Sequence, residues 1–157
     1  MSYLTENRLS SLVDLPIALP ATALKQGDWV VVATVKLVSP QRLSLRALTL
    51  QVLESTENIA NIVTGNKVVS NLGLVYCVLR KDYVSGSPGG SGSLDYLKLD
   101  GLGTVSRSTV PATFTSPGNY SVIVANNMQR STASSILGDI AFKVLLTGHF
   151  RLELSPA

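Results

Sequence analysis

An uninterrupted alternation of side chains runs from Ile140 to Leu154, and it constrains the fold more than any other feature of the sequence. The positions of one parity are all apolar or glycine: Ile140, Phe142, Val144, Leu146, Gly148, Phe150, Leu152 and Leu154. The positions of the other parity become more polar toward the C-terminus. Because alternate side chains of a strand point to opposite faces, the pattern predicts one continuous strand with a buried face. Gly148 is the position where a bulge is expected.

The chain is long enough and apolar enough to bury a core without disulfides. It has 157 residues, of which 45% are hydrophobic and only 15% are charged, and a domain of this size buries most of the surface that its unfolded chain exposes. The single cysteine, Cys77, lies between Val75 and Leu79, which predicts a small buried apolar residue. No apolar run approaches the roughly 18 residues of a membrane span, and no secretory leader is recognisable. We expect a product made in a cytoplasm that contacts no membrane.

The residue types that carry chemistry are sparse. His149 is the only histidine, so a histidine metal site or a Ser-His-Asp triad has little to be built from. The glycines from Gly86 to Gly92 lack the Gly-Lys-Ser/Thr ending of a phosphate-binding loop. The net charge is +3, but the thirteen Lys and Arg residues are scattered, with Arg80-Lys81 the only adjacent pair. We expect no enzymatic activity, no cofactor or metal, no small-molecule substrate and no nucleic-acid partner.

The N-terminal residues predict an arm ahead of the domain. Tyr3 and Leu4 belong to a segment whose apolar residues fit neither a helix nor a strand. We expect residues 1–13 to be an arm that covers its own domain or a neighbouring subunit. Residues 14–157 are expected to form one β-sandwich domain.

Several segments between the two ends carry interpretable patterns. A strand from Trp29 to Val38 is apolar on both faces at its start, so Trp29 is expected in the core. The apolar parity changes near Arg46 to Leu48, which predicts a one-residue bulge that lets a single strand serve two sheets. Glu54 to Val63 is either a short helix or a loop. An irregular stretch is expected from Gly103 to Pro111.

A glycine- and serine-rich segment, Ser85 to Ser93, follows a strand predicted from Leu72 to Val84 and has the composition of a mobile hairpin tip. Tyr83 precedes it, and Asp95 and Tyr96 follow it. Two interpretations are open. These residues form a contact surface at a flexible tip, or the tyrosines close the end of the core and the loop is a tolerated insertion.

A Pro-Gly turn leads into a Tyr-x-Val-x-Val-x-Asn pattern between Pro117 and Asn127. This segment resembles the penultimate strand of immunoglobulin-like and PKD-like β-sandwiches, and the resemblance gives Tyr120 the position of a tyrosine-corner residue. With the other short strands separated by turn signals, the sequence predicts an all-β fold. We expect an antiparallel β-sandwich of about eight strands, with immunoglobulin-like or jelly-roll topology and little helix.

The length of the last strand predicts self-association. Its fifteen residues would span roughly 50 Å at about 3.3 Å each, whereas a compact chain of this size has a diameter near ~40 Å. The strand therefore either bends at Gly148 or carries Phe150 and Leu152 into a neighbouring subunit. We expect a homo-oligomer, a trimer, that packs or exchanges its termini between subunits.

In overall character the chain resembles accessory virion proteins of tailed phages. The resemblance implies a structural virion protein without enzymatic activity, such as a head-decoration (cement), tail or baseplate component, that is made in the host cytoplasm and contacts itself and other virion proteins. The alternative is a carbohydrate- or surface-binding β-sandwich module. On either interpretation the candidate contact residues are those of the two termini and of the glycine-rich segment: Tyr3, Leu4, Tyr83, Asp95, Tyr96, Phe150 and Leu152.

Overall fold

The computed structural model describes residues 11–25, 27–55, 75–86, 88, 93–99, 102–109, 113–126 and 141–154. These residues form eight strands: β1 (Ser11–Lys25), β2 (Trp29–Leu37), β3 (Arg42–Ser55), β4 (Val75–Lys81), β5 (Ser93–Leu99), β6 (Gly103–Thr109), β7 (Gly118–Asn126) and β8 (Ala141–Leu154). The described part of the chain contains no helix, hence none that could cross a membrane. The expected all-β fold of about eight strands is confirmed.

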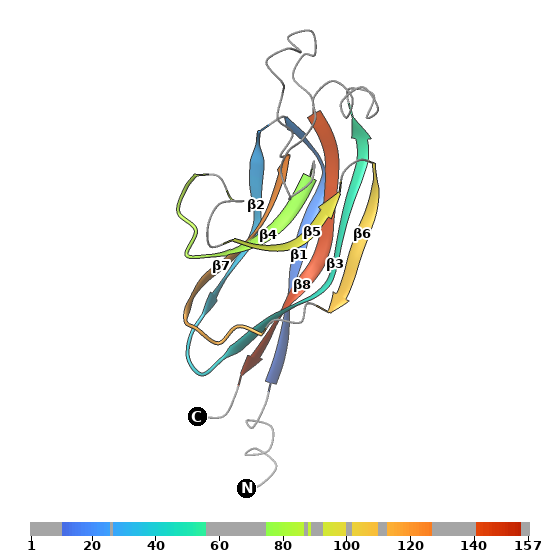
Figure 1. Cartoon of the computed structure of the whole chain (residues 1–157). Coiled ribbons are helices and arrows are strands. Elements are labelled where there is room, and N and C mark those ends of the chain that lie inside the picture. The colour runs from blue at the N-terminus through green and yellow to red at the C-terminus, as the bar shows by residue number, and fades with distance from the viewer. Residues whose placement is uncertain are drawn as a thin grey trace, which may run out of the picture.

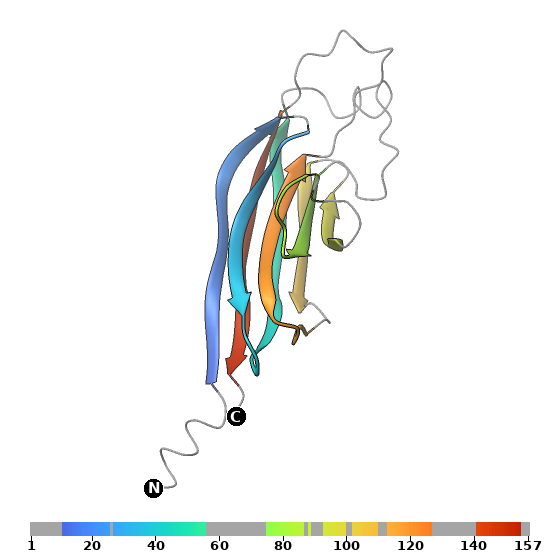
Figure 2. The same cartoon turned by 90° about the vertical axis from the view of Figure 1, so that its left-hand side faces the viewer.

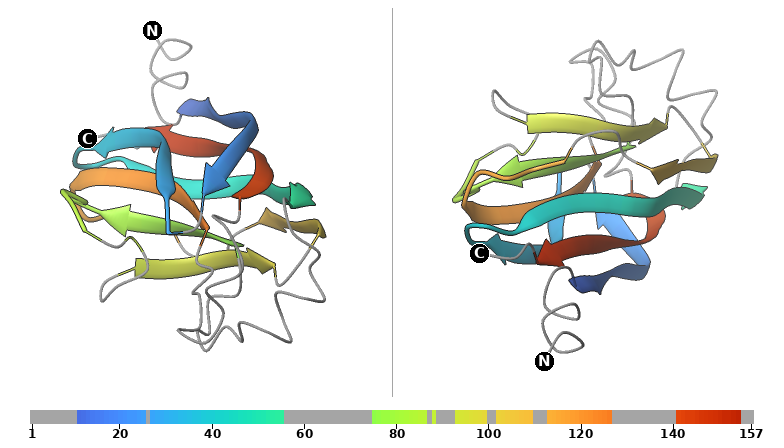
Figure 3. Two further views of the ribbon diagram at one scale, coloured as in Figure 1. Left: turned by 90° about the horizontal axis from the view of Figure 1, so that it is seen from above. Right: turned by 90° about the horizontal axis from the view of Figure 1, so that it is seen from below.

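The strands form two antiparallel sheets that pack face to face (Figures 1 and 2). Sheet I has the order β1-β8-β3-β6, and sheet II has the order β2-β7-β4-β5. Views along the strands show the two layers (Figure 3), and the core side chains lie between them. The architecture is therefore an antiparallel β-sandwich, as the turn-separated strands of the sequence predict.

The strand pairing is that of a jelly roll. The first strand pairs with the eighth, the second with the seventh, the third with the sixth and the fourth with the fifth. The contacts of β8 with β3 and of β7 with β4 complete the two sheets. One antiparallel ribbon, folded at its middle and wound around the core, produces this order, which contains the two Greek keys of a jelly roll. Of the two topologies expected from the sequence, the jelly roll is the one present.

The core between the sheets consists of aliphatic and aromatic side chains from β1, β2, β3, β4, β5, β7 and β8, and β6 adds the half-buried Val105. Its largest fully buried members include Phe142, Phe150, Leu45 and Leu48. Cys77 is among the buried residues, as predicted. Full burial of each large apolar side chain stabilises the fold by roughly 1.5 to 3 kcal/mol relative to an exposed one.

The continuous last strand is confirmed, but its proposed overhang is wrong. In β8 the side chains of Phe142, Val144, Leu146 and Phe150 are buried in the core. The strand end does not leave the domain, because β1 pairs with it along its whole length, from Ala141 opposite Lys25 to Leu154 opposite Ser11. Figure 2 shows β1 and β8 side by side along the long axis of an elongated sandwich. The elongated shape accommodates the strand length that a compact sphere would not.

The phase change in the third predicted strand is a bulge, as expected. Ala47 has a φ of +53°, and the pairing of β3 with β8 shifts by one residue between Arg46 and Thr49. Leu43 and Leu45 before the bulge and Leu48 after it are therefore all buried. The expectation that the strand serves two sheets is wrong, because β3 pairs only with β8 and β6 of sheet I. The bulge rotates the side chains while the strand stays in its sheet.

The expected burial of Trp29 is wrong. The side chain is 41% exposed, and Val31 is 43% exposed. The pairing of β2 with β7 shifts between Val31 and Ala33, so Val32 is an extra residue. Because a one-residue shift moves every side chain to the other face, Val35 and Leu37 point into the core while Trp29 and Val31 point outward.

β1 begins at Ser11, three residues before the predicted domain boundary, and it is an edge strand of sheet I. Pro16 and Pro20 lie in it, as prolines do at the edges of sheets, where no partner needs their N–H. The expected irregular stretch near Gly103 is instead β6, which pairs with β3. It has only Val105 as an inward apolar residue among its described side chains, so it lacks the alternation that signals a strand. Of the segment Glu54 to Val63, predicted to be a short helix or a loop, Glu54 and Ser55 belong to β3 and the rest lies outside the described residues.

Candidate functional site

The described residues of the glycine-rich segment are held against sheet II. Pro88 is buried, and its carbonyl oxygen accepts a hydrogen bond from Nη1 of Arg80 at 3.1 Å. The Arg80 guanidinium lies 5.4 Å from the ring centre of Tyr83, and the Tyr83 hydroxyl donates to the carbonyl of Gly86. The expectation of a free tip is therefore wrong at Pro88. Tyr83 is half-buried and packs against the buried residues of the outer face of sheet II.

The other candidate contact residues are dispersed. Asp95 and Tyr96 lie in β5, where Asp95 pairs with Val78 of β4. Phe150 is only 1% exposed, so its side chain is buried in its own domain and is not part of a contact surface. Leu152 packs against the same core. Tyr3 and Leu4 lie outside the described residues.

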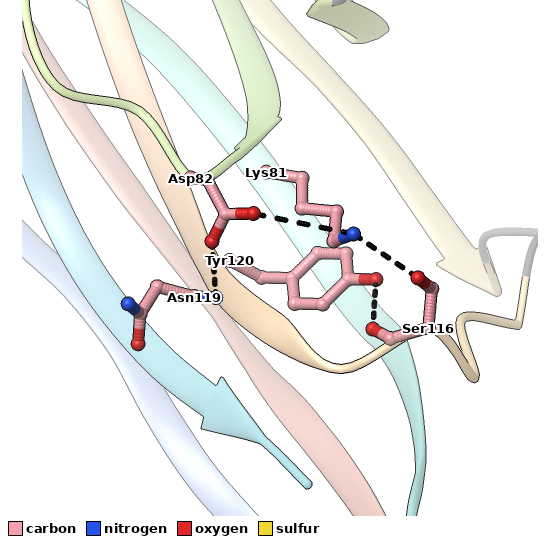
Figure 4. A network of polar contacts seen from close by, with 5 residues as sticks. All are labelled: Lys81, Asp82, Ser116, Asn119 and Tyr120. Carbon is pink, nitrogen blue, oxygen red and sulfur yellow. Dashed lines mark hydrogen bonds and ion pairs between the residues drawn. The ribbon is translucent and has the colours of Figure 1, made fainter. Parts of the chain in front are cut away.

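Tyr120 lies near the start of β7 in a network of polar contacts (Figure 4). Its hydroxyl donates to the carbonyl of Ser116 at 2.7 Å, which is the contact of a tyrosine corner. Asp82 accepts a hydrogen bond from the backbone N–H of Asn119 at 2.9 Å, and Lys81 donates to the Ser116 hydroxyl at 3.0 Å. Burial, and secondarily the negative charge of Asp82, raises the pKa of Tyr120. This network anchors the turn before β7 to the end of β4 and has no free reactive group.

A cluster of charged side chains occupies one half of the outer face of sheet I. The strands β1, β8 and β3 bring together residues far apart in the sequence, because Arg151 pairs with Asp14 on one side and with Ser44 on the other. In the next row His149 pairs with Pro16 and Arg46. We call the side chains of this half the charged cluster: Asp14, Arg42, Arg46, His149, Arg151 and Glu153.

The strongest polar contact in the charged cluster joins Arg151 to Asp14. The Nε and Nη2 atoms of Arg151 donate to the two carboxylate oxygens of Asp14 at 3.0 and 3.4 Å. This hydrogen bond lowers the pKa of Asp14 and raises that of Arg151. His149 Nε2 is 3.8 Å from Asp14 Oδ1, too far for a hydrogen bond. One carboxylate is thus already committed to one arginine.

A pocket of about 280 Å³ opens in the charged cluster. Three arginines line it, and the remaining polar lining comes from two hydroxyls and one carboxylate: Arg42, Arg46, Arg151, Ser44, Thr113 and Glu153. Nε of Arg46 is buried and has no hydrogen-bond partner. Among the described residues no three His, Cys, Asp or Glu side chains are placed to hold a metal ion together. The donors suit an anion rather than a cation.

The other half of this face is uncharged at its centre. Thr49 pairs with Thr147, and its hydroxyl is 3.1 Å from that of Ser106. Gln51 donates to Thr104 at 3.1 Å. Apart from Lys25 and Lys143, the described positive side chains on this face are therefore gathered around the pocket, and they form no continuous track along the sheet.

Part of the outer face of sheet II is apolar. Tyr76, Val78, Ile123 and Ala125 form a second cluster of buried residues there. Trp29 pairs with Ala125 and Val31 with Ile123, so both exposed side chains of β2 extend this cluster to the sheet edge. We call Trp29 and Val31 the β2 strip.

Neither the charged cluster nor the β2 strip is obvious in the linear sequence. The arginines of the pocket are scattered along the chain, but Arg42 and Arg46 share one parity opposite the buried Leu43 and Leu45, and Arg151 lies on the polar parity of the last strand. That parity was the available signal. The β2 strip gave no signal, because the bulge at Val32 is not visible in a run of valines.

The fold and these surfaces define an all-β jelly-roll sandwich with one partly charged and one partly apolar outer face. No protein-family model matches the sequence, and a search of curated proteins finds no significant relative.

Proposed function

We propose that this chain is a structural virion protein that acts through contacts between subunits and has no enzymatic activity. The jelly roll supports the proposal by analogy, because viral capsid proteins use this fold, as do lectins and cupins. Within a virion, the character of the sequence favours a head-decoration, tail or baseplate component of a tailed phage. Its partners are then further copies of itself and other virion proteins.

The observation that carries the proposal is the β2 strip. Trp29 and Val31 are each more than two-fifths exposed beside an apolar cluster that is otherwise buried. Exposed apolar side chains that adjoin one another mark association surfaces, and tryptophan is enriched among residues that dominate binding energy. β2 is also an edge of sheet II, so a neighbouring subunit can approach it from the side.

Sedimentation velocity of the full-length chain tests association. We expect a homo-oligomer at micromolar concentration, a trimer as the sequence predicts, and dissociation on Trp29→Ser. Val84→Ser is the matched control, since Val84 is 89% exposed and lies outside the β2 strip. A well-folded full-length monomer would contradict the proposal. Its virion part is tested by electron microscopy of particles from the source, where this chain should occupy regular positions.

The second candidate function is carbohydrate binding. The exposed ring of Trp29 supports it, because aromatic side chains with one free face stack on sugars and other flat ligands. Glycan binding by a monomer that Trp29→Ala abolishes, without any change in sedimentation, would favour this alternative over subunit assembly.

A further inference from the structure

We infer that the pocket in the charged cluster of sheet I is a binding site for a phosphate-type oxyanion. The inference is independent of the proposed virion role, which rests on sheet II. It starts from the composition of the pocket, where three guanidinium groups, from Arg42, Arg46 and Arg151, share a concave space with the hydroxyls of Ser44 and Thr113. Guanidinium groups bind phosphate through paired, charge-assisted hydrogen bonds.

The charge balance of the pocket leaves cationic donors unused. The cluster holds three arginines against two carboxylates, Asp14 and Glu153. Asp14 is held by Arg151. Glu153 pairs directly with Arg42 across the strands. The described residues nevertheless place no carboxylate oxygen within ion-pair distance of Arg42 or Arg46.

Arg46 supplies a second, independent observation. Its Nε–H is buried and has no acceptor. A buried donor without a partner is costly, and most buried donors in folded proteins are satisfied. Because this Nε atom is closed to solvent, an oxyanion in the pocket would supply the missing acceptor once the Arg46 side chain turns toward it. The exposed Arg42, which lies four residues before Arg46 on the same face of β3, would close over the same group.

The surroundings of the pocket favour a compact anion. Thr49, Gln51, Thr104, Ser106 and Thr147 on the adjoining part of the face are uncharged. An extended nucleic-acid backbone is normally bound by a track of several cations, and among the described side chains of this half of the face none lies between the pocket and Lys143. A nucleic acid and a free phosphate ion would both present a phosphate group to the pocket. This geometry favours the free phosphate ion.

Calorimetric titration of the full-length protein with inorganic phosphate, at constant ionic strength against chloride, tests the inference. We expect saturable binding at one site per chain. Arg42→Gln and Arg46→Gln should each weaken it about tenfold, the effect of losing one charged hydrogen bond. Lys36→Gln, the same charge change on the outer face of sheet II, is the control and should leave the affinity unchanged.

Two further measurements locate the bound anion and identify its source. The Nε–H signal of Arg46 in an NMR spectrum should shift as phosphate is added, and if Arg46→Gln does not fold, Arg46→Lys and the exposed Arg42→Gln replace it. A short oligothymidylate that displaces phosphate from the pocket would identify nucleic-acid phosphate as the source, whereas failure to displace it identifies free phosphate. Absence of saturable binding, or binding that neither Arg42→Gln nor Arg46→Lys weakens, would overturn the inference.

Discussion

Gly148 of β8 lies so close to Leu48 of β3 that a Cβ atom on Gly148 would come within 2.8 Å of the Leu48 Cδ2 atom. The same Cβ would lie 3.2 Å from the carbonyl oxygen of Arg46, and Gly148 has a φ of +156°. The glycine thus makes room for the bulge at Ala47 that turns Leu48 into the core. The sequence indicates the phase change in the third strand and the glycine in the last strand as separate features. In the structure they are in direct contact.

Gly148→Ala should therefore destabilise the protein strongly. We expect a loss of roughly 2 to 5 kcal/mol in the free energy of unfolding, from overpacking against Leu48 and the β3 backbone together with an unfavourable φ. Gly27→Ala is the matched control, because Gly27 has a φ of +81° but no atom within 4 Å of the added Cβ. It should cost only about 1 to 2 kcal/mol. Equal effects of the two changes in urea unfolding would show that the contact with Leu48 is unimportant.

Phe142→Ala and Trp29→Ala should differ sharply in stability. Phe142 is fully buried, so its truncation should cost roughly 3 to 5 kcal/mol. Trp29 is 41% exposed, so its truncation should cost about 1 kcal/mol or less in the isolated subunit. Denaturant unfolding at concentrations below the association threshold separates folding from assembly. A large loss for Trp29→Ala under those conditions would place Trp29 in the core after all.

Tyr120→Phe should remove the tyrosine-corner hydrogen bond while keeping the ring that packs 5.3 Å from Phe114. We expect a loss of about 1 kcal/mol, the usual net value of one such bond. The pKa of Tyr120 is raised above its ordinary value, so the folded state holds this proton more tightly than the unfolded state. The free energy of unfolding should therefore fall as the pH rises above about 10. The Tyr120→Phe protein should lose less stability over the same pH range. Unfolding curves of both proteins at alkaline pH measure the difference.

The pKa of Asp14 should respond to Arg151. Because the folded pKa is lowered, the contact stabilises the protein above the unfolded value of about 3.9, and this contribution disappears as the pH falls through the folded pKa. Arg151→Gln should raise the pKa of Asp14 in an NMR titration of its carboxyl carbon, and added salt should act in the same direction. Lys36→Gln is the control and should leave the titration unchanged. An unchanged midpoint in Arg151→Gln would contradict the hydrogen bond.

Shortening the segment from Ser85 to Ser93 so that Pro88 is lost should destabilise the protein. The deletion removes a buried residue and the carbonyl that accepts from Arg80, and a loss of roughly 1 to 3 kcal/mol is expected for an interrupted buried contact. A single Ala substitution at Ser85 is a milder comparison that retains Pro88. If the shortened chain unfolds at the same temperature as the full one, the contact of Arg80 with Pro88 contributes nothing to stability.

The charged cluster was only partly predictable. The parity of the last strand places His149, Arg151 and Glu153 on the outward face, as observed. The partners that create the pocket, Arg42 and Arg46, come from a strand more than a hundred residues earlier in the chain. Their meeting depends on β3 lying next to β8, a pairing that alternation does not specify.

The sequence by itself determined the continuity and the core face of β8, the bulge in β3 and the burial of Cys77. Side-chain alternation and hydrophobic burial are local properties, so the chain displays them directly. Only the tertiary structure decided that β8 lies between β1 and β3, that the bulge at Val32 turns Trp29 outward, and that Pro88 is buried. The first two depend on backbone hydrogen bonds between distant segments, and a shift of one residue in such pairing exchanges the two faces of a strand without changing its composition. The position of Pro88 involves a hydrogen bond from the Arg80 side chain, which alternation does not reveal.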